Sequence, residues 1–354
     1  MALLLDAGQA AAVAARDHSS SITIGLVNNM PDTAWEATER QFLALVRAAA
    51  GKTPVQLQLF SITDLPRADH VRGELAARYR DLAELLGTRL DGLIVTGTEP
   101  RAANLRDEPY WASLATLIDW ARHNTASTIW SCLAAHAAVL HADGIERRQL
   151  ADKQFGVFEC EVVSADPLVQ RAGPRLAVPH SRWNDLPEEA LGACGYRILT
   201  RSAAAGVDTF AGPERSFGSL FLFLQGHPEY EPGTLLREYR RDIGRFLRGE
   251  QGHYPAMPQG YFNAEASALA SAFRARAIGD RRAERIADFP MRALEAGLAA
   301  RWQRSAVGLY EKWLDYLKER KADRRAVTIT PQRPARRHRP EGSLQPAADG
   351  SSAG

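Results

Sequence analysis

Short apolar runs alternate with stretches of helical spacing over the N-terminal half of the chain. Ile22–Val27 and Asp91–Gly97 are predicted as buried strands, because they are short, apolar and bounded by turn residues. Leu75–Leu86 between them is predicted as a helix. Thr128–Trp130 is a further short strand, and it runs directly into Cys132 and a helix of small residues. This alternation predicts an α/β fold with a mostly parallel, doubly wound sheet covered by helices on both faces.

Composition shifts divide the chain into three parts. Residues 1–21 are alanine-rich and are predicted to be a flexible N-terminus, and 22–321 are predicted to be the folded domain. Within that domain, 262–321 is predicted to be a C-terminal helical region. The segment 322–354 is basic and then rich in Pro, Gly, Ser and Ala, which predicts a disordered tail.

The charge of the chain is concentrated in that tail. The formal net charge is +2, but eight Lys and Arg residues lie in 320–341, so the remainder is mildly acidic. A folded part without excess basic charge gives no support for a nucleic-acid partner. No run approaches 18 uninterrupted apolar residues, and the N-terminus lacks a basic start followed by an apolar run. Neither a membrane span nor a signal peptide is predicted.

The cysteine content points to a reducing compartment. The three cysteines, Cys132, Cys160 and Cys194, are odd in number, and their spacing fits no disulfide framework or metal knuckle. We therefore expect a cytoplasmic protein without a metal site.

Cys132 is a candidate nucleophile because it lies where a strand is predicted to meet a helix. That junction lifts a side chain above the sheet edge, and the positive end of the helix dipole stabilises a thiolate. The backbone N–H of Leu133 could then donate to an oxyanion. The alternative is that Cys132 is a buried core thiol, which is common for free cysteine.

His227 is a candidate general base. It follows an apolar strand in the segment Gln225–Glu229, and Glu229 lies two residues further on. Positions i and i+2 share a face of an extended chain, so the carboxylate could orient the imidazole. The alternative is a loop histidine beside an unrelated surface glutamate.

Four further polar residues could bind substrate. Lys153 precedes a predicted strand and could bind a carboxylate or phosphate, and Ser181 and Arg182 offer a hydroxyl and a cation in one turn. Arg241 lies on a predicted helix after His227. From spacing alone, the favoured interpretations are a solvated loop for Lys153, a polar turn for Ser181 and Arg182, and a solvated helix face for Arg241.

Several segments in register resemble one family, the homoserine O-succinyltransferase/O-acetyltransferase family of methionine biosynthesis. The resemblance covers about Ile22 to Leu317. The fold of this family is similar to that of class I glutamine amidotransferases. The segments that carry it are Asn28–Asp32, Glu39–Leu43, Asp91–Gly97, Tyr110–Trp111, Lys153–Phe158, Pro179–Arg182 and Gly226–Tyr230.

The resemblance implies a role for each candidate residue. Cys132 matches the acyl-thioester nucleophile, His227 the proton acceptor and Glu229 its partner. It also implies acyl-CoA as co-substrate with no other cofactor, homoserine as acceptor, and it leaves room for a homodimer. The residues that match substrate-contacting positions are Lys153, Ser181 and Arg241, and the loop at Gly97–Thr98 is expected to supply a second oxyanion donor beside Leu133.

Two departures from the family pattern bear on activity. The family elbow usually reads Cys-Trp-Gly-Ala-Gln, whereas this chain has Cys132–His136 with leucine second and histidine last. In the loop after Gly97, Arg101 falls where the family has glycine or glutamate. An arginine there could pair with the free carboxylate of a succinyl group, which predicts succinyl-CoA over acetyl-CoA. Alternatively, Arg101 simply faces solvent.

Two rival functions remain open from the sequence. A glutamine amidotransferase or related hydrolase would use the same three catalytic residues to release ammonia from glutamine. A non-catalytic binding or regulatory protein could keep the scaffold, and the altered elbow makes this conceivable. Retention of cysteine, histidine and glutamate together argues against the second rival.

Overall fold

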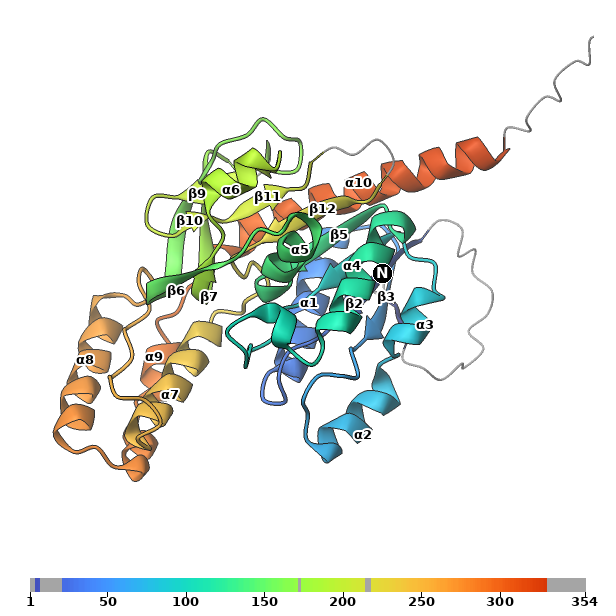
Figure 1. Ribbon diagram of the computed structural model, residues 1–354. Helices are drawn as coiled ribbons and strands as arrows, with labels where there is room; N and C mark the ends of the chain where they lie inside the picture. The colour runs from blue at the N-terminus through green and yellow to red at the C-terminus, as the bar shows by residue number, and fades with distance from the viewer. Residues whose placement is uncertain (1–3, 7–20, 171–172, 214–217, 330–354) are drawn as a thin grey trace, which may run out of the picture.

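The computed structural model describes residues 4–6, 21–170, 173–213 and 218–329, and it contains the expected, mostly parallel sheet (Figure 1). Eight strands form this sheet in the described part of the chain. In sheet order they are β1 (Leu4–Asp6), β3 (Val55–Phe60), β2 (Ile22–Val27), β4 (Gly92–Val95), β5 (Ser127–Ser131), β12 (Leu220–Leu224), β11 (Thr209–Ala211) and β8 (Arg197–Ile198). Every pairing from β1 to β12 is parallel, and β11 and β8 continue antiparallel.

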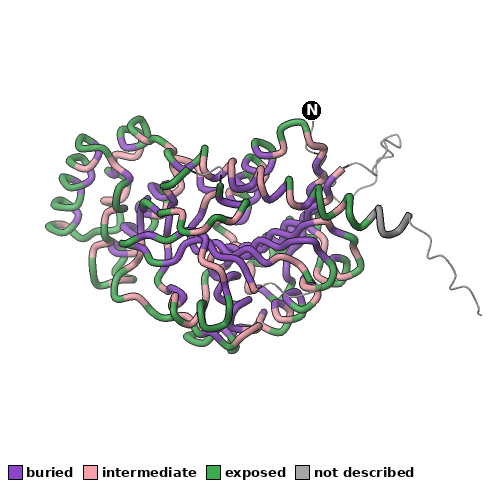
Figure 2. The backbone as a smooth tube through the Cα atoms, turned by 90° about the horizontal axis from the view of Figure 1, so that it is seen from above, coloured by how far each residue is buried: buried purple, intermediate pink, exposed green. Residues whose placement is uncertain are grey.

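Helices cover both faces of the sheet, as the alternating pattern predicts. One face packs against α1 (Trp35–Ala50), α2 (Asp69–Arg78) and α10 (Gln303–Ile329). The other face packs against α3 (Leu82–Leu86), α4 (Trp111–Asn124), α5 (Leu133–Asp143) and α6 (Glu188–Ala193). Figure 2 shows the buried strands as a continuous band between these more exposed layers. The carboxyl ends of β2, β4, β5 and β12 therefore meet at one edge.

A second, antiparallel sheet and a helical lobe follow α5. The sheet has the strand order β10 (Gly206–Val207), β9 (Thr200–Ser202), β6 (Arg148–Val162) and β7 (Arg175–Asp185). The lobe contains α7 (Thr234–Leu247), α8 (Ala264–Gly279), the 3₁₀ helix η4 (Ala283–Asp288) and α9 (Met291–Glu295), and lies beside β6 and β7 in Figure 1. Phe155 and Val157 of β6 belong to the same apolar cluster as these helices. From the residues between Gly156 and Gln225, which are rich in strand-like segments, β7, β9, β10 and most of β6 thus form a second sheet, whereas β8, β11 and β12 join the main sheet.

The structure differs from the predicted boundaries at several places. Leu4–Asp6, within the segment predicted to be flexible, pairs with β3. The predicted helix Leu75–Leu86 is two helices, because Arg80 between them leaves the helical path to pair with β3. Helix α10 continues to Ile329, into the segment predicted to be disordered. Residues 1–3, 7–20 and 330–354 lie outside the described residues.

Helix α10 is part of the core rather than an appendage. Its Trp313 donates from Nε1 to Ser127 Oγ at 2.9 Å. A Cβ atom at Gly92 of β4 would lie 2.6 Å from Leu317 Cδ1, so a larger residue there would require the helix side chains to shift. Among the described residues, no helix is both long and apolar enough to cross a bilayer.

Candidate active site

Cys132 lies at a sharp turn between β5 and α5. Its backbone has φ 52° and ψ −116°, and it is the one described non-glycine residue with positive φ. The Cys132 N–H donates to Leu224 O at 2.7 Å, which ties the turn to the end of β12. An L-residue in this region is strained, and such strain is characteristic of a nucleophile held above a sheet edge. The predicted strand-to-helix junction is therefore present.

The loop after β4 lies against the first turn of α5. A Cβ atom at Gly97 would lie 2.9 Å from the backbone nitrogen of Leu133. The first amides of a helix have no intrahelical partner and are free to bind an anion. The structure thus brings together the two segments, Gly97–Thr98 and Leu133, from which oxyanion donors are expected.

His227 follows β12 and reaches the nucleophile. Its Nδ1 lies 2.8 Å from Glu229 Oε1, and its side chain also hydrogen-bonds with Cys132. Because Glu229 occupies Nδ1, the bond to Cys132 falls to Nε2. The imidazole stacks on Tyr230 with 4.3 Å between ring centroids, and the backbone N–H of His227 donates to Pro179 O at 2.8 Å. The three residues predicted to be catalytic are therefore in contact as a chain.

The charge state of His227 follows from these contacts. Burial alone lowers the pKa of His227, but the negative charges of Glu229 and Cys132, and the hydrogen bonds to both, raise it more. The net pKa of His227 lies well above its ordinary value, so these contacts favour the imidazolium form of His227 beside Cys132.

A carboxylate that the sequence analysis missed lies beside this chain. Glu238 on α7 accepts a hydrogen bond from Tyr230 at 2.6 Å on Oε1, and one from Ser181 on Oε2. Ser181 thus joins the site through Glu238 and Tyr230. The sequence signal was present, because Glu238 lies three residues before Arg241 and shares its helix face.

Lys153 and Arg241 converge on a second missed carboxylate. Lys153 Nζ lies 2.8 Å from Asp242 Oδ2, and Arg241 Nε lies 3.0 Å from Asp242 Oδ1. Lys153 also lies over the ring of Phe155, 4.1 Å from its centroid. Burial raises the pKa of Asp242, but the positive charges and hydrogen bonds of Lys153 and Arg241 lower it by more, so the net shift is downward. The structure therefore groups the predicted substrate residues along α7, linked to acidic partners.

A cavity of about 300 Å³ opens between the ends of β2 and β4, next to the Gly97 loop. Thr98 and Arg101 line it, and Glu108 Oε1 holds the loop by accepting the amides of Arg101 at 2.6 Å and Ala102 at 2.7 Å. Four residues that line this cavity have buried polar atoms without a hydrogen-bond partner among the described residues. They are Asn29 Oδ1, Arg67 Nε, Glu108 Oε2 and Tyr110 OH. Buried polar atoms without partners are rare, and such a cluster is typical of a ligand site.

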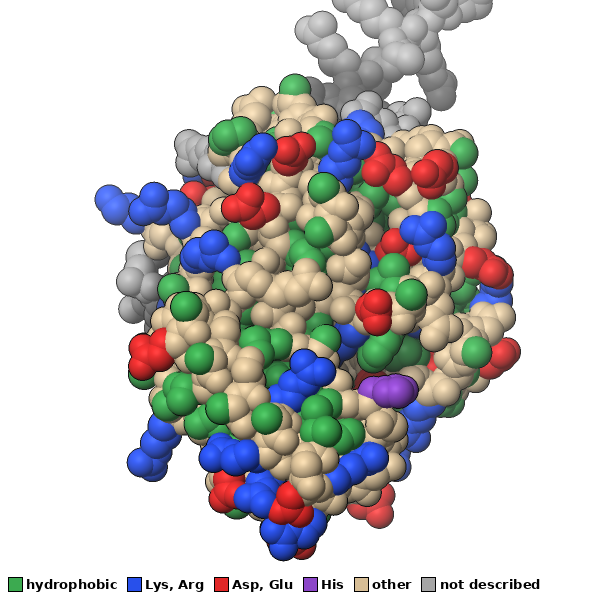
Figure 3. Space-filling model, turned by 90° about the vertical axis from the view of Figure 1, so that its left-hand side faces the viewer, with side chains coloured by type: hydrophobic (Ala, Val, Ile, Leu, Met, Phe, Trp, Pro, Cys, Tyr) green, Lys and Arg blue, Asp and Glu red, His purple; other side chains and the backbone are tan. Residues whose placement is uncertain are grey.

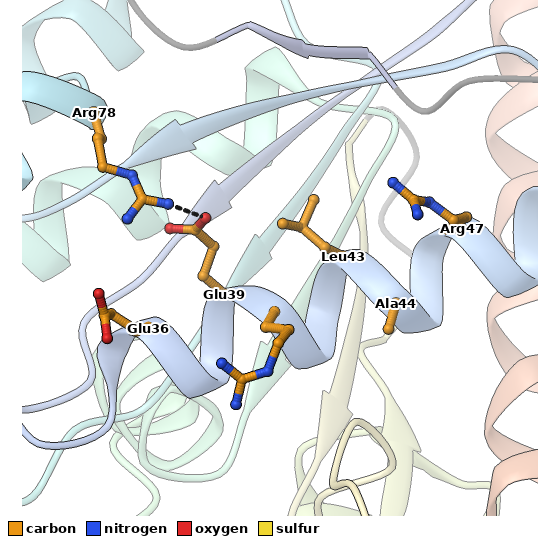
Figure 4. Close-up of a pocket in the computed structure, with 7 residues that line it drawn as sticks. Glu36, Glu39, Leu43, Ala44, Arg47 and Arg78 are labelled. Atoms are coloured by element: carbon orange, nitrogen blue, oxygen red, sulfur yellow. Dashed lines mark hydrogen bonds and ion pairs between the residues drawn. The ribbon is translucent and has the colours of Figure 1, made fainter.

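A larger concavity of about 430 Å³ runs along α1 (Figure 4). Its walls carry the ion pair of Glu39 and Arg78, 2.6 Å apart, and side chains from the outer face of the helix. It holds none of the predicted site residues. Acidic and basic side chains are interspersed on the face shown in Figure 3, without a broad region of one sign.

Behind His227, a buried cluster resembles a metal site in its geometry. Ligand atoms of Cys160, His180 and Asp208 all lie within 4.8 Å of one another. However, Arg182 Nε donates to His180 Nδ1 at 3.3 Å, and Asp208 accepts the Gly226 N–H at 3.1 Å and two threonine hydroxyls. Burial also raises the pKa of Cys160, which favours the neutral thiol. Asp208 and His180 Nδ1 are engaged within the protein, whereas His180 Nε2 has no hydrogen-bond partner among the described residues. With a neutral thiol and the Arg182 guanidinium beside it, this set fits a cation poorly.

Known proteins resemble this chain over most of its length. The family model described as homoserine O-succinyltransferase matches residues 8–323. A homoserine O-succinyltransferase of Rhodopseudomonas palustris is 51% identical over 293 residues, covering 83% of this chain and 87% of the relative. One from Methylorubrum extorquens is 48% identical, covering 85% of this chain and 88% of the relative. Among solved structures, a glutamine amidotransferase of Methylobacillus flagellatus matches with a TM-score of 0.47 and 14% identity, covering 84% of this chain and 95% of that one.

Proposed function

This chain belongs to the homoserine O-succinyltransferase family, and on that premise we propose that it transfers a succinyl group from succinyl-CoA to the hydroxyl of homoserine, in methionine biosynthesis. The observation that carries the proposal is the contact between Cys132 at its strained turn and the side chain of His227. A thiol, a base and an orienting carboxylate are the groups that acyl transfer through a thioester requires. Acyl-CoA is a co-substrate, and the cycle uses no other cofactor.

The first half of the cycle acylates Cys132. The thiolate attacks the thioester carbonyl carbon, and the oxyanion that forms is stabilised by the backbone N–H groups of Leu133 and Thr98. The bond between that carbon and the CoA sulfur then breaks. His227 gives its proton to the departing CoA thiolate, which leaves a neutral imidazole and an acyl group on Cys132.

The second half transfers the acyl group to the acceptor. His227 takes the proton of the homoserine hydroxyl as its oxygen attacks the acyl carbon. The bond to Cys132 sulfur breaks, and the thiolate reforms beside the imidazolium. Glu229 holds the imidazole in one tautomer and stabilises its charge in both halves. The cycle is ping-pong, and it consumes no water or oxidant.

The acceptor is proposed to bind against α7. An amino acid presents a carboxylate and an ammonium close together, and Arg241 and Glu238 offer opposite charges one helical turn apart. Burial lowers the pKa of Arg241, but Asp242 and Glu238 raise it more, so the guanidinium stays charged. Ser181, bonded to Glu238, and Lys153 complete the polar wall.

The donor is proposed to bind in the cavity beside the oxyanion donors. Asn29 Oδ1 and Glu108 Oε2 are unpaired acceptors, and this suits the amide N–H groups of the CoA arm. The Arg67 Nε–H and the Tyr110 hydroxyl are donors for amide carbonyl oxygens. Arg101, exposed on the same loop, would pair with the succinyl carboxylate.

The decisive experiment is intact mass spectrometry of the protein mixed with each donor in the absence of acceptor. We expect one succinyl group on the wild type with succinyl-CoA and none on Cys132→Ser. Addition of homoserine should then remove the adduct and yield O-succinylhomoserine. A matched control is Cys194→Ser, which changes an exposed cysteine and should leave the adduct in place.

The same experiment separates the alternatives. Acylation with acetyl-CoA in preference to succinyl-CoA would identify an O-acetyltransferase. Ammonia release from glutamine, with no adduct from either donor, would identify the amidotransferase-like hydrolase. Absence of both activities would contradict the enzymatic proposal.

A further inference from the structure

His136 connects the helix of the nucleophile to the segment of the base. It lies one turn into α5, and its backbone N–H donates to Cys132 O at 3.3 Å. Its imidazole is 3% exposed, and Nε2 lies 2.9 Å from Oε1 of Gln225. Gln225 is itself completely buried and precedes His227 by two residues.

The direction of this hydrogen bond follows from the other partners of Gln225. The Gln225 Nε2 group donates to Val207 O at 2.7 Å, so Oε1 is the atom that faces His136 and the Leu186 N–H, which lies 3.2 Å away. An amide oxygen only accepts, so the proton between the two side chains belongs to His136 Nε2.

His136 is therefore a neutral donor. The pKa of His136 is lowered to about 3, mainly by burial. The charges of Arg182 and Arg147 also lower it, whereas the hydrogen bond to Gln225 and the charge of Asp185 raise it. The imidazole stays uncharged at neutral pH. No step of the proposed cycle uses it.

The His136–Gln225 bond is one of two hydrogen bonds that connect the elbow and α5 to β12 and the segment before His227. On one side, the Cys132 N–H donates to Leu224 O at 2.7 Å and fixes the elbow to β12. On the other side, His136 fixes the next turn of α5 to Gln225, just before His227. The separation between Cys132 and His227 is thus set by a backbone bond and a side-chain bond that span the same two elements.

We propose that His136 is a positioning residue that holds His227 at working distance from Cys132 through the Gln225 side chain. This rests on the proposed role of Cys132 as nucleophile. A displacement of about 1 Å at a reacting pair can cost about 100-fold in rate, so the link is expected to act on kcat and on acylation rather than on substrate binding.

The test compares three variants. His136→Met keeps an apolar volume but removes the donor, and His136→Gln keeps a donor N–H at similar reach. His141→Met is the matched control, because His141 lies on the same helix but pairs with Asp119 at the surface. Each is measured for kcat and KM with both substrates, for the rate of acyl-enzyme formation by intact mass, and for melting temperature.

We expect His136→Met to lower kcat and the acylation rate by about 10- to 100-fold, with each KM within about twofold. His136→Gln should recover to within about threefold of wild type, and His141→Met should resemble wild type. The alkaline limb of the pH–rate profile of His136→Met should move to lower pH, because a His227 farther from Cys132 loses part of the interaction that raises its pKa.

Other results would overturn the inference. One is a His136→Met protein with wild-type kcat. Another is a loss of kcat that His136→Gln does not recover and that follows the melting temperature, since this indicates a purely structural role. If His136→Met does not fold, His136→Asn replaces it, because a shorter amide keeps polarity but cannot reach Gln225. Full activity of Cys132→Ser would instead refute the proposed function, whatever the His136 variants show.

Discussion

Nδ1 of His227 lies 2.8 Å from Oε1 of Glu229, and both side chains are buried. The other oxygen, Glu229 Oε2, has no hydrogen-bond partner among the described residues. The carboxylate therefore directs its interaction mainly at one ring nitrogen. This fixes which nitrogen faces Cys132. It also makes the charge of Glu229 the largest effect that raises the pKa of His227.

Glu229→Gln should reduce activity without abolishing it. The amide can present N–H to Nδ1 and favour the wrong tautomer, so we expect kcat to fall by about 100- to 10,000-fold. The pKa of His227 should also fall, which moves the alkaline limb of the pH–rate profile to lower pH. Glu231→Gln, a change in a partly exposed ion pair with Arg40, is the control. An unshifted profile would contradict this role of Glu229.

The raised pKa of His227 should also appear in stability. Its folded-state pKa lies above the unfolded value of about 6.5, so its stabilising contribution is complete below that pH and is lost as the pH rises through the folded value. Denaturant unfolding of wild type and His227→Gln at a series of pH values measures this. The stability advantage of wild type should shrink from pH 6.5 upward; an advantage that grows with pH would show the opposite sign.

Glu238→Gln should weaken acceptor binding selectively. The variant keeps hydrogen-bonding capacity toward Tyr230 but loses the charge proposed to bind the homoserine ammonium. We expect about a 10- to 100-fold rise in KM for homoserine, in line with the loss of one charged hydrogen bond. The rate of acylation by donor alone should change little. A large loss in that first step would show that Glu238 supports the catalytic residues instead.

Arg101→Ala should change donor selectivity. Removal of a charged partner of the succinyl carboxylate should lower kcat/KM for succinyl-CoA by about 10- to 100-fold, and leave that for acetyl-CoA nearly unchanged. Arg106→Ala, an exposed arginine in the same segment, is the matched control. Equal effects on both donors would mean that Arg101 faces solvent without a role in selectivity.

Cys132→Gly should stabilise the fold relative to Cys132→Ala while both are inactive. At φ 52° a side chain costs about 1–3 kcal/mol, and glycine removes this cost but loses about 0.5–1 kcal/mol through unfolded-chain entropy. A net gain of about 1 kcal/mol is expected in chemical denaturation. Equal stability of the two variants would show that the turn is not strained.

The sequence predicted the parallel sheet and the elbow because both have local signals. Runs such as Ile22–Val27 identify buried strands directly, and the passage from strand into small-residue helix located Cys132. The strand-like pattern after Gly156 could not show that these strands form a separate antiparallel sheet, since that depends on the pairing of β6 with β7 and β9. Likewise Arg80 breaks a helical pattern because a tertiary bridge to β3 outweighs local preference.

Within the site, the catalytic residues were easier to predict than their surroundings. His227 and Glu229 are close in sequence, so an extended segment brings them together. Lys153 and Asp242 are 89 residues apart, and their ion pair exists only after β6 and α7 have packed. A buried acidic partner such as Asp242 cannot be recognised from the sequence, because its spacing along the helix is the same as that of acidic residues on a solvated helix face.

Helix α10 has a consequence for biosynthesis. Its Trp313 and Leu317 pack directly under Gly92, and Lys321 Nζ reaches Asp91 Oδ2 at 2.7 Å. The part of that sheet face that α10 covers stays exposed until a segment translated more than 200 residues after Asp91 has left the ribosome. Until then a nascent chain presents that surface to solvent and to chaperones.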